Sequence, residues 1–257
     1  MAMPGWLPAS WPAPSNIHAG ISLRTFAGVS VGPYASANMG LHVGDEPAAV
    51  LLNRERLAAA LQLPSAPIWL RQVHGTAVVR IEATHAVSEA PEADAAITPT
   101  AGVVLAIQTA DCLPILLCDR SGQTLGAVHA GWRGVALGAI EACVHAMGAD
   151  PQDLLAWIGP GIGPDAFEVG ADVRDAMLAA SPNEIIAAHR AAFRPRAEHP
   201  GKWWCDLPQL AALRLRALGL SSIHIEPACT VTDSDRFYSH RRDRVTGRMV
   251  SLIWRDA

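Results

Sequence analysis

The first half of the chain combines helical patterns with several short apolar runs. Apolar residues recur at helical spacing over Val50–Leu61, and Pro47 stands just before them, so a helix is predicted there. Gly131–Gly134 predicts a tight turn that leads into a second helix over Val135–Met147. The β-rich runs of strand length are Ile68–Leu70, Ala77–Ile81, Val103–Ile107, Leu113–Cys118 and Thr124–His129.

The second half repeats this alternation less regularly. Asp206 is a typical helix N-cap and Gly219 a typical helix end, so the segment between them is predicted to be helical. Strands follow one another without regular helices between them, which favours an α+β fold of mixed sheets with flanking helices over a doubly wound parallel sheet. The predicted elements are strands at Leu154–Ile158, Ser222–Glu226 and Arg248–Trp254 and helices at Gly170–Ala180 and Leu207–Leu218.

Composition indicates a globular protein with one domain. Half of the 257 residues are hydrophobic and 17% are charged, which permits a sizeable core and excludes intrinsic disorder. No repeat, low-complexity segment or linker divides the chain after residue 16. We therefore expect an N-terminal extension at residues 1–16 and a single catalytic domain at residues 17–257.

Charge and hydropathy exclude several classes of partner. The net charge of −4 lacks the basic footprint that nucleic acid requires, and no apolar run approaches the roughly 20 residues of a membrane span. Met1–Asn16 has neither the basic nor the apolar region of a signal peptide, and the five cysteines include no C-x-x-C pair. A cytoplasmic protein with reduced thiols is expected.

Three short segments place potential metal ligands at the ends of predicted strands, beside a glycine or a turn. Two imidazoles and one thiolate suit zinc, and three protein ligands leave a fourth position open for water. The wide spacing along the chain matches no compact zinc motif, so spacing alone also allows a buried cysteine and two ordinary histidines. The segments are Arg71–Gly75 with His74, Thr109–Pro114 with Cys112, and Val128–Gly134 with His129.

Two of these motifs are specific enough to indicate a family. TADC followed by LP at residues 109–114 and HAGWRG at 129–134 occur together with further matching segments. With them the chain resembles the YfiH family, also called the multi-copper polyphenol oxidoreductase or laccase-domain family, over nearly its whole length. The supporting segments are residues 32–45, 53–54, 71–75, 159–164, 167–170, 235–239 and 241–248.

The resemblance implies a metal site, a fold and several activities. It implies one zinc bound by His74, Cys112 and His129, with copper as an alternative metal, and a fold similar to that of toxin deamidases with a Cys–His pair. The implied activities are purine nucleoside phosphorolysis, adenosine deamination and copper-dependent phenol oxidation, and one branch is linked to editing of peptidoglycan precursors. The chain departs from the family at Asp165 and Ala166, where many relatives carry cysteine, so ligands for additional copper are missing there.

The first functional hypothesis is a zinc-dependent purine nucleoside enzyme. Deamination needs an activated water and an acid or base, for which Asp111 is a candidate, although the sequence favours an orienting or capping role for it. Phosphorolysis needs a phosphate site, for which Arg133 and Arg71 are candidates. Asn38 could bind the ribose or base, or serve as a turn residue. The expected partners are a purine nucleoside and phosphate, and the chain is expected to be a monomer or homodimer.

Two other hypotheses use the same residues differently. Cys112 paired with His129 could act as a nucleophile and hydrolyse an amide in a cell-wall precursor. Zinc would compete with that role for the same sulfur. A multicopper laccase fits poorly because none of the ten histidines forms a His-x-His pair. A single adventitious copper at the three ligands is still possible.

Overall fold

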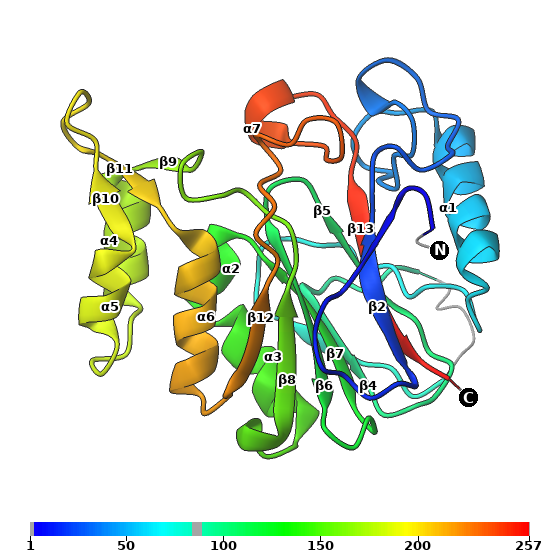
Figure 1. Cartoon of the computed structure of the whole chain (residues 1–257), viewed down its shortest axis with the longest axis horizontal. Helices are drawn as coiled ribbons and strands as arrows, with labels where there is room; N and C mark the ends of the chain where they lie inside the picture. Colours follow the sequence, from blue (N-terminus) through cyan, green and yellow to red (C-terminus); the bar gives the residue numbers. More distant parts are fainter. Residues whose placement is uncertain (1–2, 84–88, 257) are drawn as a thin grey trace.

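A six-stranded mixed sheet forms the centre of the molecule (Figure 1). The computed structural model describes residues 3–83 and 89–256. The sheet has the order β12-β8-β6-β7-β4-β3, with parallel pairs at its two edges and antiparallel pairs between them. Every residue of β6 and β8 is buried, which explains why these strands are continuously apolar in sequence. The strands are β3 (Val78–Arg80), β4 (Ala95–Thr98), β6 (Leu113–Asp119), β7 (Leu125–Ala130), β8 (Leu154–Ile158) and β12 (Ser222–Ile225).

A four-stranded antiparallel sheet packs face to face on the first. Its order is β1-β2-β13-β5, and β1 lies within the N-terminal segment that precedes residue 17. Leu116 and Trp157 of the central sheet meet Ile107 and Ile253 of the second sheet in one buried cluster. The strands are β1 (Trp6–Pro8), β2 (Ile17–Ser22), β5 (Leu105–Thr109) and β13 (Met249–Arg255).

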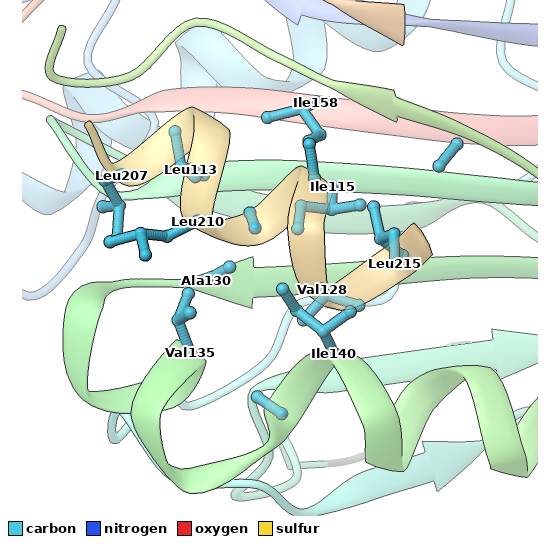
Figure 2. Packing of buried hydrophobic residues seen from close by; sticks show 14 of the residues in the cluster. Leu113, Ile115, Val128, Ala130, Val135, Ile140, Ile158, Leu207, Leu210 and Leu215 are labelled. Atoms are coloured by element: carbon cyan, nitrogen blue, oxygen red, sulfur yellow. The ribbon is translucent and has the colours of Figure 1, made fainter. Parts of the chain in front are cut away.

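Helices cover the outer faces of both sheets. Helices α3 (Ala139–Met147) and α6 (Leu207–Ala217) cover the central sheet, where Figure 2 shows Ile140 and Leu210 against the strand residues. Helix α1 (Pro47–Leu61) packs through Leu57 on the outer face of the second sheet. Across the described residues, no helix is long and apolar enough to cross a membrane. The layers are therefore helix, sheet, sheet and helix, and the expected α+β fold of mixed sheets with flanking helices is confirmed.

A smaller sheet and short helices complete the chain. Strands β9 (Glu168–Gly170), β10 (Phe193–Pro195) and β11 (Lys202–Cys205) form a three-stranded antiparallel sheet in the order β10-β11-β9. It stands to one side of the main body in Figure 1, together with two helices. The remaining helical elements are η1 (Gly32–Tyr34), α2 (Trp132–Leu137), η2 (Pro151–Asp153), α4 (Ala171–Ala179), α5 (Ile186–Ala191) and α7 (His240–Asp243).

One predicted segment was wrong and matters for the site. Gly131–Gly134 is not a tight turn, because Gly131 is an N-cap and α2 begins directly at Trp132. The break comes later, at Gly138, whose φ of 93° lies in the left-handed region that glycine adopts readily. The HAGWRG motif therefore spans the end of β7, the N-cap Gly131 and the first turn of α2.

A buried histidine between the helices makes the stability of the fold dependent on pH. Nδ1 of His189 lies 2.5 Å from the Ser181 hydroxyl, and no described residue bonds its Nε2 atom. Arg214 lies nearby and donates to Glu141 at 2.6 Å. Burial, followed by the charge of Arg214, lowers the pKa of His189 to about 4, and Glu141 opposes this shift only in part.

We expect the free energy of unfolding to fall by about 2 kcal/mol between pH 7 and pH 5 because of His189. The unfolded chain takes up this proton below its ordinary pKa of 6.5, whereas the folded chain takes it up only near 4. The contribution is therefore complete above pH 6.5 and is lost as the pH falls toward 4. Urea unfolding of His189→Gln should show a flatter pH profile, and the exposed control His199→Gln should not. Equal slopes in both variants would contradict this assignment.

Candidate active site

Three side chains from separate segments converge at one end of the two large sheets. The ligand atoms of His74, Cys112 and His129 all lie within 4.8 Å of one another. His129 is the penultimate residue of β7, and its neighbour across the ladder, Pro114 of β6, lies two residues after Cys112. His74 comes from the turn before β3. The three residues predicted as metal ligands are thus brought together by strand pairing and one loop.

The backbone around these residues is held in unusual conformations. His74 has φ of 63° and Asp111 has φ of 90°, both in the left-handed region that non-glycine residues rarely adopt. A Cβ on Gly131 would lie 2.9 Å from Sγ of Cys112 and 3.0 Å from Cδ2 of His74. Residue 131 must therefore be glycine for the thiol and the imidazole to approach each other.

Asp94 was not predicted as a site residue, yet it contacts two of the three segments. Its Oδ1 atom accepts a hydrogen bond from Nδ1 of His129 at 2.8 Å. The same carboxylate accepts the backbone N–H groups of Val73, His74 and Gly75. The bond to Nδ1 leaves Nε2 as the nitrogen of His129 that faces the other two ligands. A carboxylate that orients a ligand histidine in this way is common at metal sites.

The charges in the cluster favour a bound cation. Burial alone would raise the pKa of the Cys112 thiol, but His129 and His74 outweigh it and lower that pKa to about 6. Burial would lower the pKa of His129, but the Cys112 thiolate and Asp94 raise it to about 9. Two negative groups therefore hold a proton on His129 in the absence of a metal. A divalent cation in place of that proton would balance the thiolate and the carboxylate.

The donor set fits a single soft or borderline metal ion. Two imidazole nitrogens and one thiolate are the ligands that zinc and copper accept, and three ligands leave an open position for substrate or water. The lowered thiol pKa supplies the deprotonated sulfur that a metal requires. The three side chains could therefore together hold one such ion.

Asp111 borders the space around Cys112, and both of its carboxylate oxygens accept hydrogen bonds from neighbouring residues. Oδ1 accepts from the Thr230 hydroxyl and Oδ2 from the backbone N–H of Arg241, each at 2.6 Å. These bonds fasten the loop that carries Cys112 to the segment entering α7, which Figure 1 shows beside the ends of β5 and β13. Of the roles considered from sequence, the orienting one matches these contacts.

A polar cavity of about 410 Å³ opens beside the three ligands. Its wall carries several basic or imidazole side chains, which give it positive character. Burial and then the charge of Arg248 lower the pKa of His42, which shows that cations surround this histidine. The lining includes the ligands themselves and His42, Gln72, Gln108, Thr109, Ala110, Arg133, His240 and Arg248.

A second, apolar pocket of about 140 Å³ lies on the other side of Cys112. Trp132, Phe167 and Leu207 form its apolar walls, and the guanidinium of Arg241 lies over the Phe167 ring at 5.1 Å from its centre. The two pockets share Cys112, Ala110 and His240. The thiol therefore stands at the boundary between a basic compartment and an apolar one.

The three residues predicted to bind substrate have different surroundings. Arg133 lines the polar cavity and stacks on Trp132 at 4.4 Å. Asn38 is fully buried and bonds Gly40, Asp45 and the backbone N–H of Arg248. Arg71 is largely exposed and pairs with Glu92. The structure thus brings only Arg133 of these three to the cavity.

Arg248 and His42 line the cavity but were not chosen from the sequence. A signal for both existed, because His42 lies in the motif segment 32–45 and Arg248 ends the segment 241–248. Nothing in the residue types separated them from other surface arginines and histidines. Asn38 accepts a hydrogen bond from the backbone N–H of Arg248 at 2.8 Å and thereby fixes the backbone of that arginine.

The fold and the site together define an α+β protein that is built on two large sheets. Its His-Cys-His cluster, which could hold one metal ion, lies beside a cavity of small-molecule size. The family model described as multi-copper polyphenol oxidoreductase laccase matches residues 18–256. The chain belongs to this family.

Relatives of known name and structure match over nearly full length. A purine nucleoside phosphorylase of Pseudomonas aeruginosa is 46% identical, covering 98% of this chain and 99% of its own. The purine nucleoside phosphorylase YfiH of Escherichia coli is also 46% identical, over 95% and 96% of the two chains. The crystal structure of YlmD from Geobacillus stearothermophilus has 34% identity and a TM-score of 0.88, covering 100% and 98%. The predicted family resemblance is confirmed.

Proposed function

We propose that this chain is a purine nucleoside phosphorylase with one zinc bound by His74, Cys112 and His129, and with adenosine deamination as a minor second activity. The names of relatives at 46% identity support the phosphorylase assignment. The observation that carries it is the meeting of a basic cavity and an apolar pocket at Cys112. A nucleoside and a phosphate together need these two environments.

Phosphate is assigned to the polar cavity. Arg248, Arg133 and His42 line it, and guanidinium groups bind phosphate through paired charge-assisted hydrogen bonds. The backbone N–H of Arg248 donates to Asn38, and its guanidinium donates to the carbonyls of Thr246 and Gly247, so both ends of this residue are held by the protein itself. An anion in this cavity would lie next to the three metal ligands.

The purine base is assigned to the apolar pocket. Trp132 and Phe167 offer aromatic surfaces on which a planar base can stack. A base seated there places its glycosidic bond at the pocket mouth, beside Cys112. Its C6 atom belongs to the ring that lies farther from that bond, away from the ligands. This arrangement favours cleavage at the sugar over replacement of the C6 amino group.

In the proposed reaction a phosphate oxygen forms a bond to C1′ of the ribose. The C1′–N9 bond breaks, its electron pair leaves with the purine, and the purine takes up a proton. The chain contributes mainly by holding the two reactants in line and by placing cationic groups around phosphate, which are large terms in such reactions. A bound zinc would polarise and orient a substrate oxygen.

Zinc is proposed in preference to copper because its tetrahedral preference matches two nitrogens, one sulfur and an open position. Copper has the higher general affinity for such donors and would occupy the same atoms in copper-treated protein. Elemental analysis of freshly purified protein should therefore give stoichiometric zinc, and stoichiometric copper would contradict the assignment.

We expect adenosine and phosphate in ¹⁸O-labelled water to give mainly unlabelled adenine and ribose 1-phosphate. Deamination would instead give inosine with solvent oxygen on C6, and we expect it to be the slower reaction. Liquid chromatography with mass detection measures both products in one sample. Base release that does not depend on phosphate, or faster formation of labelled inosine, would overturn the proposed order of activities.

A Cys–His hydrolase is the second candidate, and one observation favours it. Cys112, with its pKa near 6, His129 and Asp94 follow one another as nucleophile, base and orienting carboxylate. The zinc enzyme would use the sulfur of Cys112 as a metal ligand and the hydrolase would use it as a nucleophile, so the two functions exclude each other. Alkylation of Cys112 that is rapid in chelator-treated protein and blocked by stoichiometric zinc favours the metal enzyme. Hydrolysis of an amide substrate by the metal-free form favours the hydrolase.

A further inference from the structure

One buried carboxylate bonds both segments that carry the histidine ligands. Asp94 has no exposed surface, and four N–H groups donate to its two oxygens. Oδ1 accepts from Nδ1 of His129 at 2.8 Å and from the backbone of His74 at 2.9 Å. Oδ2 accepts from the backbone of Val73 at 3.2 Å and of Gly75 at 2.6 Å.

The turn that carries His74 depends on these bonds. Residues 73–75 lie outside the named strands, Val73 is 45% exposed, and His74 is in the left-handed conformation. A left-handed non-glycine residue persists only where its surroundings hold it. Three successive N–H groups that point to one carboxylate provide that restraint, because they fix the direction of the chain through the turn.

Asp94 is itself fixed on both sides by the sheet. It stands just before β4, its carbonyl accepts the N–H of His129 at 2.7 Å, and its own N–H donates to Ala77 at 3.1 Å. The carboxylate therefore has a position set by the backbone ladder. Asp94 can therefore fix the turn at residues 73–75 on one side and the imidazole ring of His129 on the other.

We infer that Asp94 is the positioning residue for both histidine ligands, setting His129 through its ring and His74 through its backbone. The inference rests on the metal-binding part of the proposed function. It assigns Asp94 no contact with substrate. It requires that Asp94 control the affinity and geometry of the metal site separately from the stability of the fold.

Replacement by asparagine separates these roles because it preserves the shape of the side chain. Asparagine keeps one acceptor oxygen and puts an NH₂ donor in place of the other. Against residues 73–75 this donor would face N–H groups. If the NH₂ group instead faced His129, it would donate to Nδ1 and favour the tautomer with the proton on Nε2. In that tautomer Nε2 has no free lone pair with which to bind a metal.

The experiment compares the wild type, Asp94→Asn and the control Asp119→Asn as full-length proteins freed of metal. Asp119 is a buried carboxylate at the end of β6 that accepts from the backbone of Thr124 and lies outside the site. Titration with Co²⁺ reports geometry through the absorption bands of thiolate-bound cobalt. Competition with a chelator gives the zinc affinity, and thermal unfolding of the metal-free proteins reports the fold.

We expect Asp94→Asn to bind zinc about 10- to 100-fold more weakly and to shift the cobalt bands. Excess zinc should restore part of its phosphorolysis, and Asp119→Asn should match the wild type. Equal affinity and identical cobalt bands in Asp94→Asn overturn the inference while leaving the metal site in place. Failure of the wild type to bind either metal overturns both this inference and the proposed metal centre.

A measurement on the wild type covers the case in which Asp94→Asn does not fold. Nitrogen-15 spectra of the histidine rings in the zinc-loaded protein should show a proton on Nδ1 of His129 and metal on Nε2. Zinc on Nδ1 of His129 would mean that the bond to Asp94 is broken in the loaded site. That result would overturn the positioning role.

Discussion

Cys112→Ala is expected to give a folded protein that holds zinc well below stoichiometric levels and has lost its phosphorolysis. The sulfur is one of the three proposed ligands and the only one of them that carries a negative charge, so its removal leaves two imidazoles. The loss of affinity should exceed the roughly 10- to 100-fold effect of removing an outer partner of a ligand. Folding should persist because alanine is smaller than cysteine and fits the space that the thiol fills beside Gly131. Elemental analysis and circular dichroism measure the two effects.

Cys229→Ser is the matched control for Cys112→Ala. Cys229 is a partly exposed thiol whose sulfur accepts the N–H of Gly163, and a serine hydroxyl can accept the same bond. This variant should keep full zinc and activity. Full zinc retention in Cys112→Ala would exclude the proposed ligand set, and normal phosphorolysis without zinc would exclude a catalytic use of the metal.

The fold could be predicted where burial determines the sequence pattern. β8 has the bounds that its apolar run predicts, and β6 extends its predicted run by one residue, because both strands are buried on two faces. Asp206 caps α6 through a 2.9 Å bond to the N–H of Gln209, as its residue type indicated. The strands β9, β10 and β11 were missed because each has only three or four residues and a single buried position, which leaves no apolar pattern.

The site could be predicted only as far as side-chain chemistry is visible in a motif. His74, Cys112 and His129 stood out because each lies at a predicted strand end beside a glycine or a turn, in segments that resemble a known family, and the structure brings them together. Asp94 carries no such signal. Its role comes from the pairing of β4 with β7, which places Asp94 across from His129. The register between two strands cannot be predicted from the sequence of either strand alone.

Arg71 and Arg248 show the same limit among the arginines. From sequence Arg71 was the second candidate for phosphate after Arg133, because it precedes His74 by three residues, and Arg248 was not considered. In the structure its side chain is 67% exposed and pairs with Glu92, whereas Arg248 lines the cavity from the far end of the chain. Nearness along the chain did not translate into nearness in space, since the turn at residues 73–75 points His74 inward.

We expect Arg248→Met to lower phosphorolysis about 100- to 1000-fold, mainly through weaker use of phosphate. Methionine keeps much of the apolar stem but removes the guanidinium, which supplies positive charge beside Cys112 in a partly buried cavity. An anion in a partly desolvated site depends strongly on such a charge, because water cannot replace it fully. Initial rates at varied phosphate and saturating inosine measure the effect, and binding of the nucleoside alone should change little.

Arg133→Met and Arg71→Met in the same assay test the assignment of the other two arginines. Arg133 stacks on Trp132 and lines the cavity, so its loss should also raise the phosphate requirement, by less than the loss of Arg248. Arg71 is exposed and paired with Glu92, and an exposed ion pair contributes little, so Arg71→Met should stay within about twofold of the wild type. A large phosphate defect in Arg71→Met together with normal kinetics in Arg248→Met would move the phosphate site out of the cavity and toward the turn before His74.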